Sequence, residues 1–213
     1  MQTQSKKQEY FYADSNAGHH HQYLLNPLKQ LLLKSSYPPH KKSRILDLGC
    51  GNGSLTNLIA QQGYEVIGVE ESLSGVKLAN QNYPNCKFIQ GSIYNLLFSE
   101  LENQFDVVVS AEVIEHLFYP RELAKAAKKC LKPNGQLIIT TPYHGYLKNL
   151  VLAASGKMDQ HFTVLWDGGH IKFFSVKTLT ELLIAEGFTN IQFKFTGRLP
   201  YLWKSMLCSC QLK

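Results

Sequence analysis

Long apolar runs are missing from this sequence of 213 residues. A membrane-spanning helix needs about 20 consecutive apolar residues, and no segment comes near that length, which argues against a chain that crosses a bilayer. The segment Met1 to Glu9 is polar and lacks the apolar centre of a secretory signal peptide. We therefore expect a protein that stays in the cytoplasm.

Cysteine and acidic residues are both scarce. The five cysteines are scattered, and the one close pair, Cys208 and Cys210, lies in an apolar stretch typical of a strand, so we expect buried, reduced thiols. Acidic residues number 16 against 22 lysines and arginines, a net charge of +6. This excess suits an anionic substrate, a nucleic acid or an acidic membrane surface, but the lysines are spread along the whole chain and form no basic run.

Alternating strand and helix patterns predict an α/β fold in one main domain. Leucines at helical spacing predict a first helix over Tyr23 to Lys34, which Pro38 ends. Further helices are expected over Ser54 to Gln62, Gly75 to Gln81 and Thr178 to Ala185. The expected strands are Arg44 to Leu48, Tyr64 to Glu70, Lys87 to Gln90, Phe105 to Ser110, Gln136 to Thr140, Ile191 to Phe195 and Ser205 to Cys210. Such alternation predicts a mostly parallel sheet covered on both faces.

The chain divides into a short N-terminal part and a larger domain. Residues 1–43 are expected to form a helical cap that contributes to a substrate pocket, and residues 44–213 the main domain. A long insertion at about 143–170 separates the fifth strand from the last helix and is rich in aromatic residues, glycine and histidine. Long loops at such a place usually serve function, so we expect a lid.

The strongest local motif is Asp47-Leu48-Gly49-Cys50-Gly51-Asn52-Gly53, between a strand and a helix. Glycines there let the backbone turn sharply and approach a ligand, while the start of the helix offers free N–H groups. A dinucleotide site would have a third glycine where this chain has Ser54, so the spacing argues against NAD. Glu70 ends the second strand, 23 residues after Asp47, where a carboxylate can accept both hydroxyls of a ribose.

With the strand Phe105-Asp106-Val107-Val108-Val109-Ser110, these features resemble class I S-adenosylmethionine-dependent methyltransferases over roughly residues 44 to 196. The resemblance implies a Rossmann-like, mostly parallel seven-stranded sheet with helices on both faces and an antiparallel C-terminal strand. It also implies that Gly49 and Gly51 face the methionine part of S-adenosylmethionine, Glu70 the ribose, and the turn at Ser92 and Ile93 the adenine. Asp47 is a further cofactor-binding candidate. The family often has an acidic residue where this chain has Ser92.

A second motif, Glu112-Val113-Ile114-Glu115-His116, follows the fourth strand. On a helix, Glu112, Glu115 and His116 would share one face, because they stand at i, i+3 and i+4. The carboxyl ends of the central strands are where open α/β sheets bind their ligands, so these side chains should lie near the transferred methyl group. The plainer alternative is the start of a surface helix whose polar face continues to Glu122.

This motif, with the distant His170-Ile171-Lys172-Phe173, is similar to ubiquinone-pathway O-methyltransferases and to small-RNA terminal 2′-O-methyltransferases. The resemblance implies a divalent metal, Mg²⁺ first, held by Glu112, Glu115, His116 and His170. Two histidines are unusual ligands for Mg²⁺, which prefers oxygen, so manganese or another transition ion is a second candidate. Without a metal, His116 or His170 would act as general base or hold the acceptor, and Glu112 is a further candidate catalytic group.

The methyl acceptor is expected between the N-terminal segment and the insertion, where aromatic and polar side chains gather. The candidate contacts are Tyr12, His20, Tyr143, His144 and Tyr146, although ordinary packing explains each of them equally well. The apolar helical face of 146–154 suits a lid, and it also suits peripheral contact with a membrane or a protein partner.

The leading hypothesis is transfer of a methyl group from S-adenosylmethionine to a hydroxyl oxygen of a small molecule, with metal assistance. A small-molecule N-methyltransferase is the nearest alternative. An RNA methyltransferase is less expected, because the related families add RNA-binding domains that this chain lacks, although the positive charge is compatible with nucleic acid. A non-catalytic S-adenosylmethionine-binding protein is the alternative from a different class.

Overall fold

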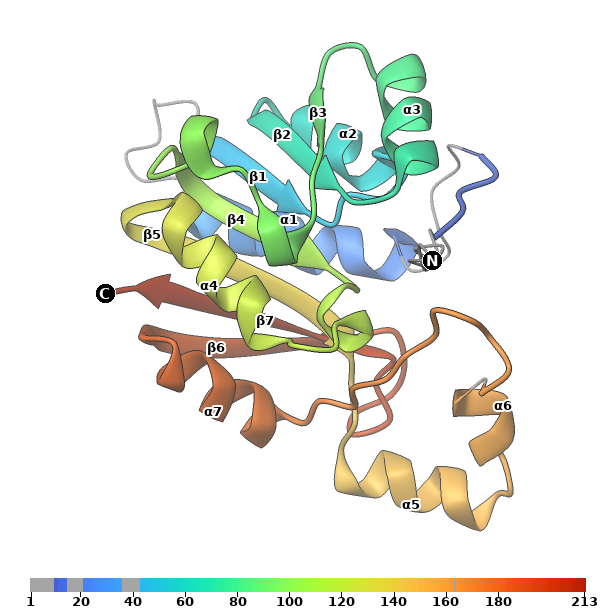
Figure 1. Cartoon of the computed structure of the whole chain (residues 1–213). Coiled ribbons are helices and arrows are strands. Elements are labelled where there is room, and N and C mark those ends of the chain that lie inside the picture. The colour runs from blue at the N-terminus through green and yellow to red at the C-terminus, as the bar shows by residue number, and fades with distance from the viewer. Residues whose placement is uncertain (1–9, 15–20, 36–42, 163) are drawn as a thin grey trace, which may run out of the picture.

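The computed structural model describes residues 10–14, 21–35, 43–162 and 164–213. Its centre is a seven-stranded sheet (Figure 1) in the order β3 (Lys87–Gln90), β2 (Glu65–Glu70), β1 (Arg44–Leu48), β4 (Phe105–Ala111), β5 (Leu131–Pro142), β7 (Ser205–Leu212) and β6 (Phe188–Thr196). The pairs from β3 to β5 are parallel, and β7 is antiparallel to both of its neighbours. The predicted mostly parallel, seven-stranded sheet with an antiparallel C-terminal strand is confirmed.

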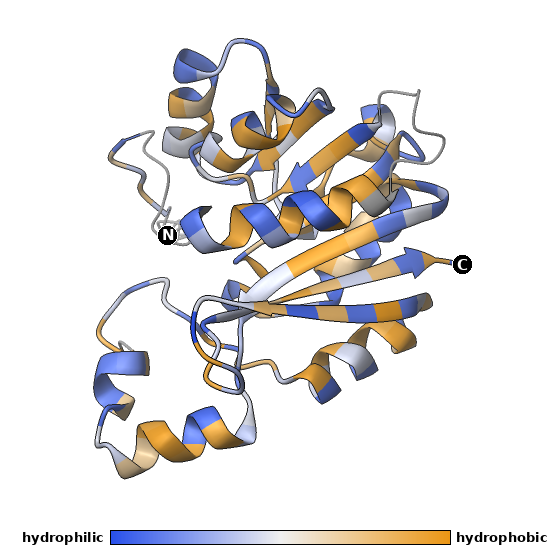
Figure 2. Ribbon diagram, turned by 180° about the vertical axis from the view of Figure 1, so that it is seen from behind, coloured by the Kyte–Doolittle hydropathy of each residue, from blue (hydrophilic) through white to orange (hydrophobic). Residues whose placement is uncertain are grey.

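Helices cover both faces of this sheet. One face is covered by α1 (His21–Ser35), α2 (Ser54–Ala60) and α3 (Leu73–Asn82), and the other by α4 (Arg121–Cys130) and α7 (Val176–Ala185). Figure 2 shows α1 lying across the first face, while α4 and α7 lie in front of the sheet in Figure 1. Three short 3₁₀ helices, η1 (Ile93–Asn95), η2 (Phe98–Glu100) and η3 (Ile114–His116), follow β3 and β4.

Successive side chains of β4 point alternately into two layers of the core. Val107 and Val109 belong to the cluster under α1 and α2, whereas Val108 packs in the cluster under α4 and α7, as expected for a strand covered on both sides. Leu24 and Leu28 of α1 are fully buried in the first cluster. The N-terminal helix is therefore part of the core of the sheet domain, and its hydrophobic face holds it there.

Strand β5 differs most from the sequence prediction, which placed its start at Gln136. The strand begins at Leu131 and contains Asn134 at φ 61°. The register of β4 against β5 shifts between Phe105 and Val107, so the additional residues form an irregularity within a paired strand.

The insertion at about 143–170 contains two helices, α5 (Tyr146–Ala154) and α6 (Met158–Phe162). Figure 1 shows both helices projecting beyond the sheet at the edge where the parallel strands end. The apolar side chains of α5 lie largely outside, with Tyr146 84% exposed, and contact of this face with a membrane or a partner stays a prediction.

The cysteine side chains lie in the interior of the fold. All five cysteines are free and buried, which confirms the expectation of reduced thiols. None of the helices that the structure describes is long and apolar enough to span a membrane.

Candidate active site

A cavity of about 830 Å³ opens at the carboxyl ends of β1, β2, β4 and β5. The N-terminal segment, the glycine loop, the region after β4, the insertion and the turn between β6 and β7 all contribute to its wall. The residues that line it include Tyr10, Tyr12, Asp47, Gly49, Gly51, Glu70, Glu112, Val113, His116, Lys148, His161, Trp166, His170, Arg198, Lys204 and Ser205. The cavity is large enough for a cofactor and a small second substrate together.

The loop after β1 is held close to β2 by its backbone. The N–H groups of Gly49 and Cys50 both donate to the carbonyl oxygen of Val69, at 2.8 and 3.0 Å. Gly49 has φ 79°, and a Cβ atom there would lie 2.6 Å from Cγ2 of Val113. Glycine is therefore required by both the left-handed backbone and the close approach of the segment after β4.

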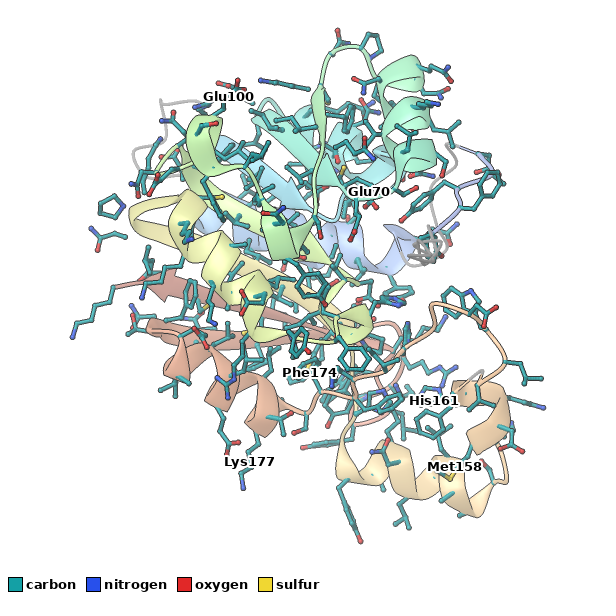
Figure 3. The ribbon with its side chains drawn as sticks, in the orientation of Figure 1. Glu70, Glu100, Met158, His161, Phe174 and Lys177 are labelled. Atoms are coloured by element: carbon teal, nitrogen blue, oxygen red, sulfur yellow. The ribbon has the colours of Figure 1, made fainter. Side chains whose placement is uncertain are left out.

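Glu70 ends β2 beside this loop (Figure 3) and is only 9% exposed. Its Oε2 accepts a hydrogen bond from the N–H of Gly51 at 2.9 Å, and its Oε1 accepts one from the N–H of Ser72 at 2.8 Å. Burial raises the pKa of this carboxyl, and the two backbone donors oppose that rise. A carboxylate offers about four lone-pair sites, so both oxygens keep capacity for ribose hydroxyls.

Asp47 lies under the glycine loop, where it is 1% exposed and accepts a hydrogen bond from the hydroxyl of Thr56 at 2.7 Å. Burial raises the pKa of Asp47 to about 7. The carboxyl lines the cavity, and its hydrogen bond fixes the start of α2 relative to β1.

The raised pKa of Asp47 predicts a pH-dependent stability. In the unfolded chain this carboxyl ionises near pH 4, whereas in the folded chain it keeps its proton until about pH 7, so the folded state binds more protons and loses stability as pH rises through this window. Asp47→Asn, which cannot titrate, is expected to lose less free energy of unfolding between pH 5 and pH 8 than the wild type. Urea unfolding at both pH values measures the difference, and equal losses in the two proteins would contradict the assignment.

Tyr12 covers the glycine loop from the N-terminal side. A Cβ atom on Gly51 would lie 2.9 Å from its hydroxyl oxygen, and its backbone N–H donates to Oγ of Ser74 at 3.2 Å. The ring of Tyr10 packs on Tyr12 and also on Trp166 of the insertion, with ring centroids 4.8 and 6.3 Å apart. The N-terminal segment and the insertion therefore meet above the glycine loop. Tyr12 lines the cavity, and its contact with the acceptor stays a prediction.

The turn predicted to hold the adenine lies outside the cavity wall. Oγ of Ser92 donates to Oε2 of Glu71 at 3.1 Å and accepts from the N–H of Tyr94 at 3.4 Å. Ile93 packs against the core. The turn follows β3, whose Gln90 pairs with Glu70, so it lies one strand beyond Glu70, and its contact with adenine stays a prediction.

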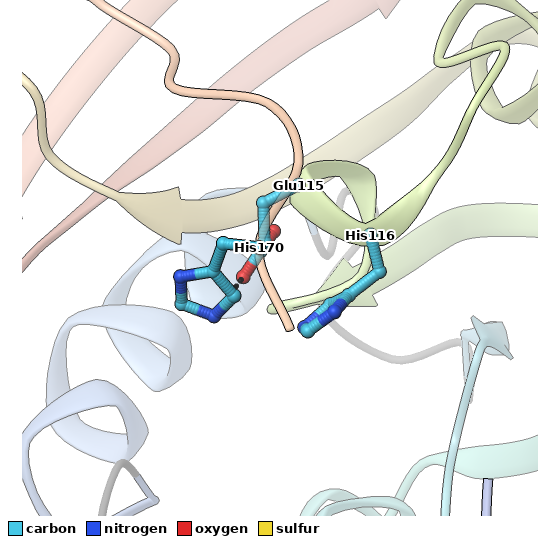
Figure 4. Close-up of side chains that lie close together, drawn as sticks. All are labelled: Glu115, His116 and His170. Atoms are coloured by element: carbon cyan, nitrogen blue, oxygen red, sulfur yellow. Dashed lines mark ion pairs between the residues drawn. The ribbon is translucent and has the colours of Figure 1, made fainter. Parts of the chain in front are cut away.

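Three of the four predicted metal ligands come together at the rim of β4 and β5 (Figure 4). Glu115, His116 and His170 each offer a ligand atom, and these atoms lie within 4.8 Å of one another. Oε2 of Glu115 accepts from the hydroxyl of Thr141 at 3.1 Å, but Oε1 is buried without a hydrogen-bond partner and lies 4.0 Å from Nε2 of His170. A fully buried carboxylate oxygen without a donor is costly unless a cation or a proton satisfies it.

The backbone of the same residues positions the cluster. The carbonyl of Glu115 accepts from the N–H groups of Ile171 and Lys172, at 2.9 and 3.0 Å, which places His170 beside it. Nδ1 of His116 lies 2.7 Å from the carbonyl oxygen of Gly168. Because a carbonyl only accepts, that nitrogen carries the proton and Nε2 keeps its lone pair.

The electrostatics of the cluster suit a divalent cation. Burial lowers the pKa of His170 to about 4 and also lowers that of His116, so both rings are neutral near pH 7. Burial and the neighbouring Glu112 raise the pKa of Glu115. Neutral imidazoles and a carboxylate oxygen that lacks a partner form a donor set for a divalent ion, and two nitrogen donors favour manganese or another transition ion over Mg²⁺.

Glu112 departs from the prediction. It does not share a helical face with Glu115 and His116, because it has φ 56° and precedes a 3₁₀ turn of three residues. Its Oε1 accepts from Thr140 at 2.8 Å and its Oε2 from Ser205 at 3.4 Å, and the carboxyl lies outside the three-residue cluster. The surrounding protein desolvates Glu112 and raises its pKa to about 7.

Most of the predicted acceptor contacts lie elsewhere. Tyr143 packs against Phe195 and Trp203, and His144 is buried against the rings of the insertion. Tyr146 points outward on α5. None of these three lines the cavity, and His20 lies outside the described residues.

Sequence reasoning missed the cations of the cavity. Lys148, Arg198 and Lys204 all line it, but they stand in segments that carry no recognised motif. The one available signal was Lys148, a single charged residue within the otherwise apolar helix Tyr146–Ala154.

The sheet order, with the glycine loop after β1 and a carboxylate at the end of β2, is the arrangement that the resemblance to S-adenosylmethionine-dependent methyltransferases implied, and comparison with known proteins agrees. A family model described as a methyltransferase domain matches residues 17–193. The chain therefore belongs to this methyltransferase-domain family, and the class predicted from the sequence is confirmed.

Curated relatives include ubiquinone biosynthesis O-methyltransferases. The chain is 33% identical over 105 residues to the mitochondrial protein of Schizosaccharomyces pombe, a match over 46% of this chain and 37% of that protein. It is 30% identical over 132 residues to the protein of Pelagibacter ubique, over 62% of this chain and 55% of that protein. The match thus spans about half or less of the length of these relatives.

Solved structures share the fold. A protein of Pyrococcus horikoshii superimposes with a TM-score of 0.69 at 23% identity and covers 95% of both chains. A SAM-dependent methyltransferase from Archaeoglobus fulgidus superimposes with a TM-score of 0.65 at 19% identity, over 87% of this chain and 93% of that one.

Proposed function

We propose that this protein transfers the methyl group of S-adenosylmethionine to a hydroxyl oxygen of a small molecule with the help of a divalent metal ion. The observation that carries the proposal is the cluster of Glu115, His116 and His170, which holds a buried carboxylate oxygen without a hydrogen-bond donor and whose two histidines line the cavity shared with the glycine loop. The curated relatives, named for O-methylation, support oxygen as the acceptor atom.

Methyl transfer requires the acceptor oxygen to lie in line with the sulfonium carbon, and positioning supplies much of the rate. The glycine loop and Glu70 would hold the cofactor over β1 and β2, and the region after β4 would hold the acceptor. Tyr10, Tyr12 and Trp166 meet above the loop and would exclude water from the reacting atoms.

Glu115, His116 and His170 would hold the metal ion, which when bound would supply Lewis acidity that lowers the pKa of an acceptor hydroxyl. The backbone carbonyl of Gly168 orients His116, and the backbone carbonyl of Glu115 orients the segment of His170. Both rings are neutral near pH 7, so each would offer a nitrogen lone pair to the ion, and the proton of the acceptor hydroxyl would leave to water. Without the ion, the lone pair of either ring would instead accept that proton.

A matched pair of probes tests the acceptor atom. 4-Methylcatechol and 4-methyl-1,2-phenylenediamine present oxygen or nitrogen at the same ring positions. With radiolabelled S-adenosylmethionine and Mn²⁺ or Mg²⁺, we expect label on the catechol, little on the diamine, and loss of transfer on addition of a chelator. Mass spectrometry locates the added methyl group.

The other outcomes favour the other functions. Label on the diamine alone would support N-methylation and contradict the proposal. Labelled RNA in a parallel reaction, with none on either probe, would support an RNA methyltransferase. Bound S-adenosylmethionine with no transfer to any acceptor would support a non-catalytic binding protein.

A further inference from the structure

Three cations line the cavity on the side of β5 and β7. Lys148 comes from α5, and Arg198 and Lys204 come from the turn between β6 and β7. Nζ of Lys148 donates to the carbonyl oxygen of Tyr143 at 2.7 Å and lies 3.5 Å from that of Lys204. The lysine therefore joins the insertion to the β6–β7 turn, and the cations are brought together from distant parts of the chain.

Lys148 is buried without a carboxylate partner. It is only 4% exposed, and lysines are almost never fully buried unless they are paired. Its two acceptors are carbonyls, and no ion pair joins it to an acid within the part of the chain that the structure describes. The carboxyl that acts on it electrostatically is Glu112, whose oxygens already accept from Thr140 and Ser205. Among the described residues, this positive charge is thus offset at a distance by Glu112 and by no direct ion pair.

Arg198 adds a second cation at the same wall. Its side chain is exposed, and it forms no hydrogen bond or ion pair among the described residues. Burial, together with repulsion from Arg198, lowers the pKa of Lys148 to about 8. Two like charges on one cavity wall are unfavourable until an anion lies between them, and the guanidinium fork of arginine matches a carboxylate or a phosphate.

The order of the strands places these cations on the far side of Glu112 from the glycine loop. The glycine loop follows β1, Glu112 follows β4, Pro142 ends β5 and Ser205 begins β7, in that spatial order. Neighbouring strands lie about 4.8 Å apart, so the wall at β5 and β7 lies roughly 10 to 14 Å from the loop. A small molecule that presents its hydroxyl near β4 would reach this wall with its other end.

We propose that the methyl acceptor carries an anionic group, a carboxylate or a phosphate monoester, which Lys148 and Arg198 bind. The inference rests on the proposed transfer to a small acceptor and names the chemical class of that acceptor. Lys204, whose Nζ lies 5.2 Å from the ring centroid of Tyr23, adds positive potential to the same wall. The carboxylate of the cofactor is the competing anion, so the test is made with that position already filled.

The test is a calorimetric titration of the whole chain saturated with S-adenosylhomocysteine, which supplies the cofactor carboxylate. The probes are 3,4-dihydroxybenzoate, its neutral analogue 3,4-dihydroxybenzyl alcohol, and phenyl phosphate. We expect the benzoate to bind at least about tenfold more tightly than the alcohol, as charge-assisted hydrogen bonds are the stronger ones. Comparison of the benzoate with phenyl phosphate shows which anion fits better.

Two variants assign the preference to its residues. Arg198→Gln removes an exposed side chain without described partners, so it is expected to fold normally and to reduce the preference for the benzoate to less than about threefold. Lys148→Met is expected to act in the same direction, with thermal melting as the check on folding. Arg121→Gln is the matched control, because Arg121 pairs with Glu186 on the outside of α4, and it should keep the full preference.

Several results would overturn the inference. The first is a wild type that shows no preference for either anion over the neutral probe, or that binds none of the probes. The second is an Arg198→Gln variant that keeps the full preference. The third is a preference that vanishes when a chelator is added, which would place the carboxylate on a metal ion. Methylation of the neutral probe without any anion preference would leave the proposed function standing and remove only this inference. An anion preference without transfer to oxygen would support this inference and contradict the proposed function.

Discussion

Replacement of Glu70 by alanine is expected to weaken the binding of S-adenosylmethionine at least about 100-fold. A hydrogen bond to a charged group contributes about 1.5 to 3 kcal/mol, and a carboxylate that accepts two ribose hydroxyls makes two of them. The substitution also removes the acceptor for the N–H groups of Gly51 and Ser72, which loosens the glycine loop. Calorimetric titration of the cofactor measures the loss, and circular dichroism and thermal melting check the fold.

Glu65→Ala is the matched control for this prediction. Glu65 begins the same strand at its far end, pairs with Arg44 and has a side chain that is 51% exposed. It should bind the cofactor as the wild type does. A folded Glu70→Ala protein with an affinity within threefold of the wild type would show that the ribose is held elsewhere.

Glu115→Gln is expected to reduce the affinity for Mn²⁺ by at least about 10- to 100-fold, since loss of even an outer partner of a metal ligand costs that much. The two side chains have the same shape, and the hydroxyl of Thr141 can donate to the amide oxygen as it does to Oε2. In the wild type, added Mn²⁺ should raise the melting temperature by mass action. The variant should show little response.

The metal-free proteins provide an independent measurement. Burial raises the pKa of Glu115, and its Oε1 has no hydrogen-bond donor, so at pH 7 this carboxyl costs folding free energy. With a chelator present, Glu115→Gln is therefore expected to melt at or above the melting temperature of the wild type. With Mn²⁺ present, the variant is expected to melt below the wild type.

Glu122→Gln serves as the control for the metal site, because Glu122 lies on α4 and pairs with Lys125 at the surface. A wild type that shows no response to Mn²⁺ or Mg²⁺ would remove the metal from the mechanism. His116 and His170 would then act only through hydrogen bonds and proton transfer.

Local patterns brought four of the six predicted cofactor residues to the cavity: Asp47, Gly49, Gly51 and Glu70. The glycine loop and Glu70 both stand at strand ends, and a parallel sheet brings the carboxyl ends of its strands to one edge whatever the loops contain. Spacing in the sequence predicts position in space here because each of the four lies in a regular strand or within three residues of one.

The motif after β4 shows where spacing in the sequence fails to predict position in space. Helical spacing placed Glu112 with Glu115 and His116, but a positive φ at Glu112 turns the chain before a short 3₁₀ turn begins. Glu112 then finds Thr140 and Ser205 from other strands. A single backbone angle decides this, and no periodic pattern predicts one.

By itself, the sequence determined the alternation of strands and helices and the glycine loop, because these depend on short-range spacing and on which residues avoid water. Its resemblance to known methyltransferases gave the class of the protein and the metal-ligand candidates. Only the tertiary structure decided which side chains face the cavity. Lys148 turns inward from an apolar helix while Tyr146 turns outward, and Arg198 reaches the same wall from a turn far along the chain. Long-range packing sets these directions, and a local stretch of sequence carries no record of the surface against which it will pack.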